Sequence, residues 1–443
     1  MSETETSTDM KNYMGTITAF GCIAEHLGHS FSGEIHHLIG LALQKAGLAE
    51  AYPYVLQELR PDEVDSFMRA HTFSGINVTI PYKQTVIPYL DELTDIAREI
   101  GAVNTVVNRD GRLIGHNTDF YGMNVLLSLA NIDIEGKKVL IFGTGGTSKT
   151  ATAVARHGGA REILKFSRKA QEGCLTYDVL SQHLDAEVII NTTPVGMYPN
   201  DENCPLPADI ALHDFPSLCG VLDAIYHPLR TELVSEALRL GIPATGGLPM
   251  LVAQAVAATE RFLNIDIPTD IVRTVTAAIE AQKQNVVLIG MPASGKTTVG
   301  RLLSERLQMP LFDTDEEITR VVGATSAELI QARGEHAFRE IESEVIRDMI
   351  APMSGVIVAT GGGAILRDEN VRRLKRNGKL IFLDRSLESL ETTADRPLSS
   401  DRDALRRRYE ERYPRYCAVA DMHLTVADGE KPEITAERVL ENT

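Results

Sequence analysis

The sequence predicts an α/β protein built from parallel sheets, and three observations support this fold class. Residues 138–157 combine a short apolar run, a glycine-rich loop and a helical pattern, and residues 286–307 repeat that order. Around both stretches, short β-branched runs alternate with longer helical patterns, which is typical of parallel sheets covered by helices on both faces. A chain of 443 residues is long enough for two or more such domains.

Composition narrows the class of protein. The formal net charge of -17 disfavours nucleic acid as a partner, because phosphate backbones need a basic surface. No apolar stretch approaches the length of a membrane span. The five cysteines form no C-x-x-C pair, as expected for a reduced, cytoplasmic protein without a structural zinc ion. Residues 1–14 are polar and are expected to form a disordered tail.

The glycine-rich loop of the second half matches a phosphate-binding pattern. A G-x-x-x-x-G-K-T motif runs from Gly290 to Thr297, directly after an apolar run at 286–289 that predicts a buried strand. Backbone N–H groups of such a loop surround a phosphate chain, Lys296 reaches the outer phosphates and the threonine hydroxyl meets Mg²⁺. A helix predicted over 298–307 adds the positive end of its dipole.

Polar residues next to predicted strands are the first candidates for substrate binding. A strand is expected over 15–21, and Ser30 and Ser32 alternate in the loop beyond it, so that an extended loop points both hydroxyls the same way. Lys83 stands at the predicted start of a helix, where a cation is electrostatically unfavourable. Asp119 precedes another helix. Each also has a structural interpretation, as a helix cap or a solvated surface residue.

The glycine-rich loop of the first half is similar to a dinucleotide-binding turn. Gly143 and Gly145 follow an apolar strand, and Ser148 stands where a third glycine is usual. The next strand ends without the acidic residue that takes the ribose hydroxyls of NAD. Arg168 and Lys169 stand there instead and suit a 2′-phosphate, so the sequence favours NADP.

Taken with later motifs, the first half resembles the shikimate dehydrogenase family over nearly its whole length. The motifs occur in the family's order: His29-Ser-Phe-Ser-Gly33, Asn77-Val-Thr-Ile-Pro-Tyr-Lys83, Gly101-Ala-Val-Asn-Thr105, Asn117-Thr-Asp119 and Gly247 to Gln254. In that family an NADP-binding lobe with a Rossmann-like fold interrupts the substrate lobe. The resemblance therefore implies a substrate lobe of residues 15–120 plus 248–283 and an NADP lobe of residues 121–247.

The resemblance also implies the residues of this site. Lys83 and Asp119 match the catalytic pair, in which an ammonium stabilises negative charge on a ketone oxygen and delivers a proton while a carboxylate positions it. The implied substrate-binding residues are Ser30, Ser32, Thr79, Lys83, Asn104, Asp119, Tyr226 and Gln254. The implied NADP-binding residues are Gly143, Gly145, Gly146, Thr147, Ser148, Ser167, Arg168, Lys169, Thr192 and Gly247. Two departures are Gly33, where the family has proline, and Ser167-Arg-Lys in place of Asn-Arg-Thr.

More motifs follow the phosphate loop in the second half. Asp313 and Asp315 alternate at a predicted strand end, and Arg339 lies near the first turn of a predicted helix. A strand over 355–359 runs into the triple glycine Gly361 to Gly363. Motor ATPases and GTPases carry a Walker-B aspartate at the end of this strand. The triple glycine therefore disfavours those classes and suits the close approach of backbone to a small substrate.

Together with Asp395-Arg-Pro-Leu398 and Arg412-Tyr-Pro-Arg-Tyr416, these motifs resemble the shikimate kinase family over residues 285–443. The resemblance implies a P-loop, parallel α/β domain of the nucleoside monophosphate kinase type. The implied ATP-binding residues are Gly290, Met291, Pro292, Ala293, Ser294, Gly295, Lys296, Thr297, Thr298, Arg396 and Pro432. The implied substrate-binding residues are Asp315, Arg339, Gly361, Gly362, Gly363 and Arg412, and Thr297 and Asp313 are the implied Mg²⁺ ligands.

Catalytic roles follow from the same resemblance. Asp315 orients or deprotonates the attacking hydroxyl, while Lys296 and Arg396 neutralise charge on the transferring phosphoryl group. The segment ahead of Arg396 is short and lacks an arginine that many relatives carry, so weaker nucleotide binding is expected.

The two resemblances imply a fusion of consecutive enzymes. NADPH-dependent reduction of 3-dehydroshikimate would give shikimate, and ATP-dependent phosphorylation would give shikimate 3-phosphate. Two alternatives stay open from the sequence: a quinate or quinate/shikimate dehydrogenase that uses NAD, fused to the kinase, and a metabolite-binding regulator without turnover. The presence of Lys83, Asp119, Lys296 and Asp315 argues against the regulator, because binding alone needs fewer of these groups. The sequence leaves the oligomeric state open.

Overall fold

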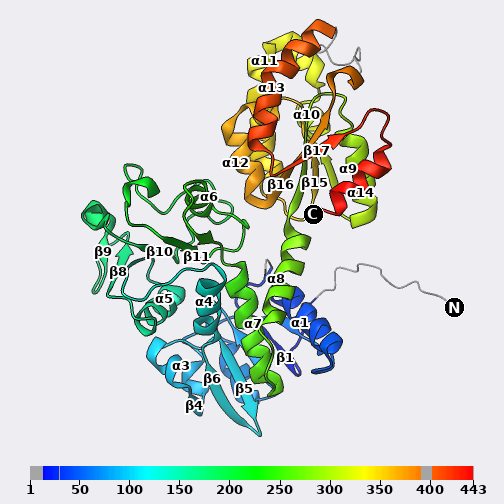
Figure 1. The fold of residues 1–443 in the computed structure, drawn as a ribbon. Helices are drawn as coiled ribbons and strands as arrows, with labels where there is room; N and C mark the ends of the chain where they lie inside the picture. Colours follow the sequence, from blue (N-terminus) through cyan, green and yellow to red (C-terminus); the bar gives the residue numbers. More distant parts are fainter. Residues whose placement is uncertain (1–12, 29, 391–401, 443) are drawn as a thin grey trace, which may run out of the picture. The chain divides into compact units, whose positions relative to one another are not determined.

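The computed structural model describes residues 13–28, 30–390 and 402–442 (Figure 1). These residues group into two compact units. The first unit comprises the described residues of Met1–Pro194, Pro205–Tyr226 and Glu236–Ile279, and the second those of Val195–Cys204, His227–Ser235 and Glu280–Thr443. Within the described residues, no helix is both long enough and apolar enough to cross a bilayer.

The first sheet of the first unit has six strands in the order β2-β1-β3-β5-β6-β4. The strands are β1 (Phe20–Ala24), β2 (Val55–Glu58), β3 (Gly75–Val78), β4 (Glu92–Leu93), β5 (Thr105–Arg109) and β6 (Arg112–His116). Strands β1, β2 and β3 run parallel, whereas β5 is antiparallel to both β3 and β6. As a result, the end of β3, the start of β5 and the end of β6 meet at one edge of the sheet.

Helices cover this sheet and connect it to the next one. They are α1 (Ser32–Ala46), α2 (Val64–Ala70), α3 (Asp95–Ile100), α4 (Thr118–Leu129), α7 (Leu248–Leu263) and α8 (Asp270–Lys283). Helices α4 and α7 lie side by side (Figure 1). A side chain at Gly122 would meet the carbonyl oxygen of Met250 at 2.7 Å, so glycine permits this close approach. The contact brings Gln254 next to the first turn of α4.

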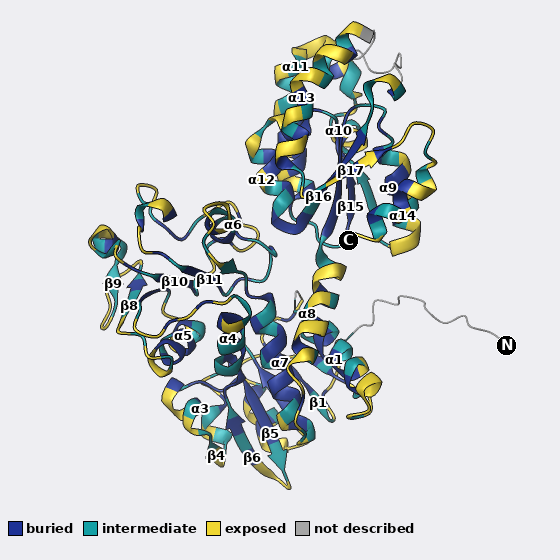
Figure 2. Cartoon of the chain, in the orientation of Figure 1, coloured by how far each residue is buried: buried dark blue, intermediate teal, exposed yellow. Residues whose placement is uncertain are grey.

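The second sheet of the first unit is wholly parallel, with the strand order β12-β11-β10-β7-β8-β9. Its strands are β7 (Lys138–Phe142), β8 (Glu162–Ser167), β9 (Leu175–Thr176), β10 (Val188–Asn191), β11 (Gly220–Asp223) and β12 (Ala244–Thr245), and α5 (Gly146–His157) and α6 (Glu232–Arg239) accompany them. Strands β7, β10 and β11 are buried throughout (Figure 2). This arrangement confirms the doubly wound, parallel fold expected for the middle of the chain.

The second unit contains a five-stranded parallel sheet in the order β14-β15-β13-β16-β17. Its strands are β13 (Asn285–Ile289), β14 (Leu311–Asp313), β15 (Ile357–Ala359), β16 (Gly378–Arg385) and β17 (Met422–Val426). Its helices are α9 (Lys296–Leu307), α10 (Thr314–Val322), α11 (Ser326–Val345), α12 (Asp368–Asn377), α13 (Arg402–Val419) and α14 (Pro432–Leu440). The predicted P-loop class of parallel sheet is confirmed.

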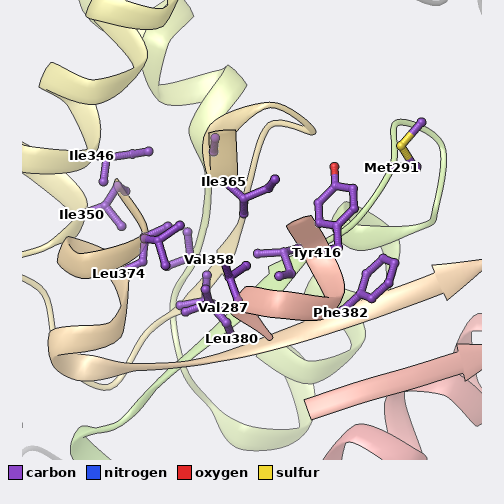
Figure 3. Close-up of a cluster of buried hydrophobic side chains, with 14 of the residues drawn as sticks. Val287, Met291, Ile346, Ile350, Val358, Ile365, Leu374, Leu380, Phe382 and Tyr416 are labelled. Carbon is purple, nitrogen blue, oxygen red and sulfur yellow. The ribbon is translucent and has the colours of Figure 1, made fainter. Parts of the chain in front are cut away.

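The core of the second unit reaches directly to its phosphate loop. Val287, Phe382 and Tyr416 are buried in one cluster that joins β13, β16 and α13 (Figure 3). The rings of Phe382 and Tyr416 stack with centroids 4.8 Å apart, and the Tyr416 hydroxyl donates to the carbonyl oxygen of Gly290 at 2.9 Å. Packing of the core thereby fixes the start of the loop.

Three local predictions from the first half are wrong. The first strand runs over Phe20–Ala24 rather than 15–21, because Cys22, Ile23 and Ala24 are the buried residues. No α-helix begins at Lys83, which lies in consecutive turns ahead of the 3₁₀ turn Ile87–Tyr89. Nearby prolines and β-branched residues disfavour a helix there. Asp119 lies in the first turn of α4, and the helix cap is Asn117 instead.

Candidate active sites

The first candidate site lies at the sheet edge where β3, β5 and β6 meet. Lys83 Nζ donates a hydrogen bond of 2.6 Å to Oδ2 of Asp119, and both side chains are largely shielded, with 20% and 11% of their surface exposed. Asp119 lies in the first turn of α4, where the helix dipole favours a negative charge. The two residues predicted as a catalytic pair are therefore in direct contact.

The other oxygen of this carboxylate is held by an amide. Asn104 Nδ2 donates to Asp119 Oδ1 at 2.9 Å, while Asn104 Oδ1 accepts from the backbone N–H of Thr118 at 2.7 Å. Thr105, which is fully buried, also donates to Asn104 Oδ1 at 3.3 Å. These donors fix which end of the amide faces the carboxylate. Thr105 and Thr118 were not predicted as site residues, although both belong to motifs quoted above.

The remaining predicted substrate residues gather in two groups. Gln254 Oε1 lies 3.4 Å from Asn104 Nδ2, which links α7 to the Lys83–Asp119 pair. Ser30 Oγ donates to Ser32 Oγ at 3.0 Å, so the two hydroxyls lie together as the alternation predicts. The ring of Tyr226 packs on Phe31, which stands between the serines, with centroids 5.3 Å apart. Burial raises the pKa of the Tyr226 hydroxyl, which keeps it a hydrogen-bond donor.

Gly33 and Thr79 complete the description of this lobe. A side chain at Gly33 would meet the ring of Tyr13 at 2.5 Å, which explains why this chain has glycine in place of the family's proline. Thr79 follows β3 directly and donates its backbone N–H to Ile23 at 3.1 Å, and its side chain is half-buried. Thr79 and Lys83 therefore both lie in the segment that follows the C-terminal end of β3.

The predicted NADP-binding loop has the geometry of a phosphate-binding turn. Gly143 has φ +111°, and a side chain there would lie 2.6 Å from Thr192 Oγ1. Ser148 Oγ donates to the carbonyl oxygen of Gly143 at 2.7 Å, so the serine in place of a third glycine closes the turn. The positions of Gly145 and Gly146 face open space at the start of α5. That space and the helix N-terminus suit a pyrophosphate.

Three further predicted NADP residues follow strands of the same sheet or cap α7. Arg168 follows β8 and forms no salt bridge with the part of the chain that the structure describes. It is close enough to Tyr177 to oppose the burial that raises the pKa of that tyrosine to about 12. Gly247 caps α7, and a side chain there would overlap the carbonyl oxygen of Ala224 at 2.2 Å. Lys169 is exposed, and its backbone N–H donates to Ser167 Oγ at 3.3 Å.

The second candidate site surrounds the P-loop between β13 and α9. Gly290 and Gly295 have φ +150° and +92°, and Lys296 Nζ donates to the carbonyl oxygens of Gly290 and Met291 at 3.0 and 2.8 Å. The loop residues Met291, Pro292, Ala293 and Ser294 lie between these glycines, and Thr297 and Thr298 open α9. Pro432 is at the start of α14. Arg396 lies outside the described residues.

The predicted Mg²⁺ ligands lie in contact with each other. Thr297 Oγ1 donates to Asp313 Oδ2 at 2.7 Å, and Asp313 Oδ1 accepts the backbone N–H of Asp315 at 3.0 Å as the cap of α10. Asp315 Oδ1 accepts from Ser326 at 2.9 Å. No group of three or more His, Cys, Asp or Glu side chains able to hold a metal ion occurs among the described residues.

The predicted shikimate-binding arginines converge on the triple glycine. Arg412 Nη1 donates to the carbonyl oxygen of Gly362 at 3.2 Å, and a side chain at Gly363 would overlap the guanidinium of Arg339 at 2.1 Å. The backbone N–H of Gly361 donates to Thr314 Oγ1 at 2.7 Å, which ties the glycines to the residue before Asp315. The structure therefore brings these groups together from four separate stretches of sequence.

Several contacts in this unit were missed by sequence reasoning. Arg385, at the end of β16, donates to the carbonyl oxygen of Ser294 at 3.2 Å and so braces the P-loop. Glu342 is fully buried and accepts from Arg339 at 2.7 Å. The spacing of Arg339 and Glu342 is a signal for this contact, because residues three apart share a helix face. No pattern in the sequence points to Arg385.

Comparison with known proteins agrees with this geometry. The family model "Shikimate dehydrogenase substrate binding domain" matches residues 22–106, and "Shikimate kinase" matches residues 292–442. A shikimate dehydrogenase (NADP(+)) of Clostridium beijerinckii is 34% identical over 250 residues, which cover 54% of this chain and 90% of that protein.

Solved structures give the same answer for the first part of the chain. The chorismate mutase/shikimate 5-dehydrogenase fusion protein of Clostridium acetobutylicum is 32% identical, with a TM-score of 0.54 and coverage of 60% of this chain and 98% of that one. Shikimate 5-dehydrogenase of Thermus thermophilus, solved with NADP(H) and shikimate, is 26% identical, with a TM-score of 0.52 and coverage of 59% and 99%. The chain therefore belongs to the shikimate dehydrogenase family and continues into a shikimate kinase domain.

Proposed function

We propose that this chain catalyses two consecutive reactions, the NADPH-dependent reduction of 3-dehydroshikimate to shikimate and the ATP-dependent phosphorylation of shikimate to shikimate 3-phosphate. The contact between Lys83 and Asp119 supports the first reaction most directly, because a largely shielded ammonium held by a carboxylate is the proton donor that ketone reduction needs. Family membership and the kinase domain support the pairing of the two steps.

In the dehydrogenase site, the chain's residues bind and orient the substrate and protonate its ketone oxygen. Bound NADPH supplies the hydride. Lys83 stabilises the negative charge that develops on the ketone oxygen and gives it a proton, while Asp119, itself held by Asn104, keeps the ammonium in place. The paired hydroxyls of Ser30 and Ser32 suit the substrate's carboxylate. Arg168 and Lys169 support a preference for NADP, because cationic side chains pair with a 2′-phosphate.

In the kinase site, the proposed roles follow the positions of charged groups. The P-loop backbone and Lys296 bind the phosphates, and Asp315 orients the attacking hydroxyl. Arg339 and Arg412 hold the carboxylate of shikimate, because a guanidinium matches a carboxylate with two parallel hydrogen bonds. Because the triple glycine has no side chains, its backbone N–H donors can lie close to the substrate. Arg396 would add positive charge at the transferring phosphoryl group.

A magnesium ion fits this site only as a partner of the nucleotide. Thr297 and Asp313 offer a hydroxyl and a carboxylate in contact at 2.7 Å. These are oxygen ligands of the kind that Mg²⁺ prefers, and the ion usually completes its octahedron with water and substrate phosphates. We therefore propose that Mg²⁺ enters with ATP. The five cysteines form no disulfide with the described residues, which fits a reducing compartment such as the cytoplasm.

Two assays on the purified chain test the proposal. We expect NADP⁺ reduction with shikimate, and separately ADP release with shikimate, ATP and Mg²⁺. Turnover with NAD⁺ and quinate at equal or higher efficiency would instead indicate a quinate/shikimate dehydrogenase. Absence of turnover in both assays, with shikimate still bound, would indicate a metabolite-binding regulator and contradict the proposal.

A further inference from the structure

The arginine expected to hold the substrate's carboxylate already holds two carboxylates of the chain. Arg339 Nη1 donates to Glu342 at 2.7 Å, and its Nη2 donates to Glu335 Oε1 at 3.0 Å. Although burial opposes the charge, Glu342 and Glu335 raise the pKa of Arg339 further above its usual value. A substrate carboxylate that approaches these two terminal nitrogens therefore competes with both glutamates for N–H donors.

The two glutamates differ in their freedom to leave. Glu342 has none of its side chain exposed, whereas Glu335 has 42% exposed. Glu335 also follows Gly334, where φ +84° and ψ 163° break the helical backbone inside α11. The side chain of Glu335 can therefore turn into water more readily than that of Glu342, which stays with Arg339.

The carboxylate of Glu335 lies between Arg339 and Arg412, the two arginines predicted to bind the substrate's carboxylate. The same oxygen that accepts from Arg339 lies 3.9 Å from Arg412 Nη2. A third guanidinium, Arg408, is close, and its Nη1 is buried without a hydrogen-bond partner among the described residues. Burial, together with the neighbouring Arg412, lowers the pKa of Arg408. Three cations then surround one exchangeable carboxylate, so an incoming anion gains strongly if Glu335 leaves.

We propose that Glu335 is an internal competitor for the carboxylate-binding place of the kinase site. In the empty site its carboxylate pairs with Arg339 and Arg412, and the substrate's carboxylate displaces it. Binding is then an exchange of one carboxylate for another, and the apparent affinity falls by the fraction of molecules in which Glu335 has turned away. This inference rests on the proposed function of the second unit as a shikimate kinase.

The test measures kinase kinetics in the full chain without NADP, so that the dehydrogenase stays silent. We expect Glu335→Gln to lower the KM for shikimate about three- to tenfold, since tenfold corresponds to about 1.4 kcal/mol, with kcat unchanged. Competitive inhibition by benzoate, a simple carboxylate, should strengthen by a similar factor. A residue with a merely structural role would raise KM or lower kcat when changed.

A matched control and a second variant complete the experiment. Glu340 lies in the same helix, is exposed and pairs only loosely with His336 at 3.7 Å, so Glu340→Gln removes the same charge and should leave KM unchanged. Glu335→Asp, which keeps the charge on a shorter arm, should also lower KM. An unchanged or higher KM in both Glu335 variants would overturn the inference. If the unaltered chain releases no ADP with shikimate, the proposed function itself fails.

Discussion

Asn104 Nδ2 donates a 2.9 Å hydrogen bond to Asp119 Oδ1, while Lys83 takes the other oxygen of the same carboxylate at 2.6 Å. Each oxygen of Asp119 therefore has its own donor, one neutral and one charged. This arrangement fixes the orientation of the carboxylate and places the ammonium of Lys83 in one position. It makes the pair depend on residues that need not touch the substrate.

Replacing Asp119 by asparagine removes the charge that holds Lys83. We expect Asp119→Asn to lower kcat for shikimate oxidation by about 10²-fold or more, the usual size of a general acid–base contribution, with a smaller effect on KM. Steady-state kinetics with NADP⁺ measure this. Asp95→Asn, at a fully solvated carboxylate in the same unit, is the control. A kcat within threefold of the unaltered chain would show that Asp119 has no catalytic role.

Thr105 is expected to act through Asn104. Its hydroxyl also contacts Thr118 Oγ1 at 3.1 Å, so Thr105→Val leaves a packed site without this donor. Asn104 Oδ1 then keeps only the donors of Thr118, so the amide is held less firmly against Asp119. We expect kcat to fall about tenfold, the cost of roughly one hydrogen bond at about 1.4 kcal/mol. Thr105→Ser should restore most of the activity. Equal losses in both variants would mean that packing, not the hydroxyl, is responsible.

His36 makes the first unit sensitive to acid. The imidazole is buried, stacks on Tyr54 with ring centroids 3.7 Å apart and contacts the Tyr52 hydroxyl through Nδ1 at 2.8 Å. Burial lowers the pKa of His36 from 6.5 to about 3. The unfolded chain therefore takes up a proton below about pH 6.5 while the folded chain does not, so stability falls as the pH falls through this window.

At pH 5 this group alone costs about 2 kcal/mol of the free energy of unfolding, relative to pH 7. Urea unfolding followed by loss of NADP⁺ reduction, at both pH values, measures it. We expect His36→Gln to be less stable than the unaltered chain at pH 7, with a gap that narrows by about 2 kcal/mol at pH 5. His26→Gln, at an exposed imidazole, is the control. A gap that stays constant with pH would contradict the role of His36.

Arg385 is expected to support nucleotide binding. It donates to Ser294 in the P-loop, and its Nη2 lies 4.0 Å from the position of a side chain at Gly295. Removing the guanidinium loosens the loop and takes a positive charge from beside the phosphates. We expect Arg385→Ala to raise the KM for ATP about tenfold, or about 1.4 kcal/mol, without changing the KM for shikimate.

The control for this variant is Arg407→Ala, which removes an exposed arginine from α13. The KM for ATP should not change in the control. Equal KM values for ATP in Arg385→Ala and the unaltered chain would show that Arg385 does not contribute to nucleotide binding.

The sequence predicted the parallel sheets because their signals are local. A buried strand, a glycine-rich loop and a helix follow one another at 285–307, and each element depends on its own residues. The same holds for the order of elements around Gly143. The mixed sheet of the first unit was not predicted, since the reversal of β5 depends on pairing with β3 and β6 across distant sequence.

The candidate residues were predicted better than their contacts. Lys83 and Asp119 were paired correctly, yet the helix expected at Lys83 is absent from the described turns of 80–86 because prolines interrupt it. The orientation of the Asn104 amide depends on hydrogen bonds from Thr105 and Thr118. The Nη2 group of Arg339 is already hydrogen-bonded to Glu335. Such contacts are set by side-chain geometry after folding, which residue spacing does not determine.

The central claim is that two separate sites on one chain handle the same hydroxy acid. The most direct measurement supplies 3-dehydroshikimate, NADPH, ATP and Mg²⁺ to the unaltered chain, to Lys83→Ala and to Lys296→Ala, and follows NADPH, ADP and the products together. We predict that the unaltered chain forms shikimate 3-phosphate. Lys296→Ala should oxidise NADPH normally and accumulate shikimate without releasing ADP. Lys83→Ala should not oxidise NADPH but should still release ADP when shikimate is added. Normal ADP formation in Lys296→Ala, or normal NADPH oxidation in Lys83→Ala, would contradict the account.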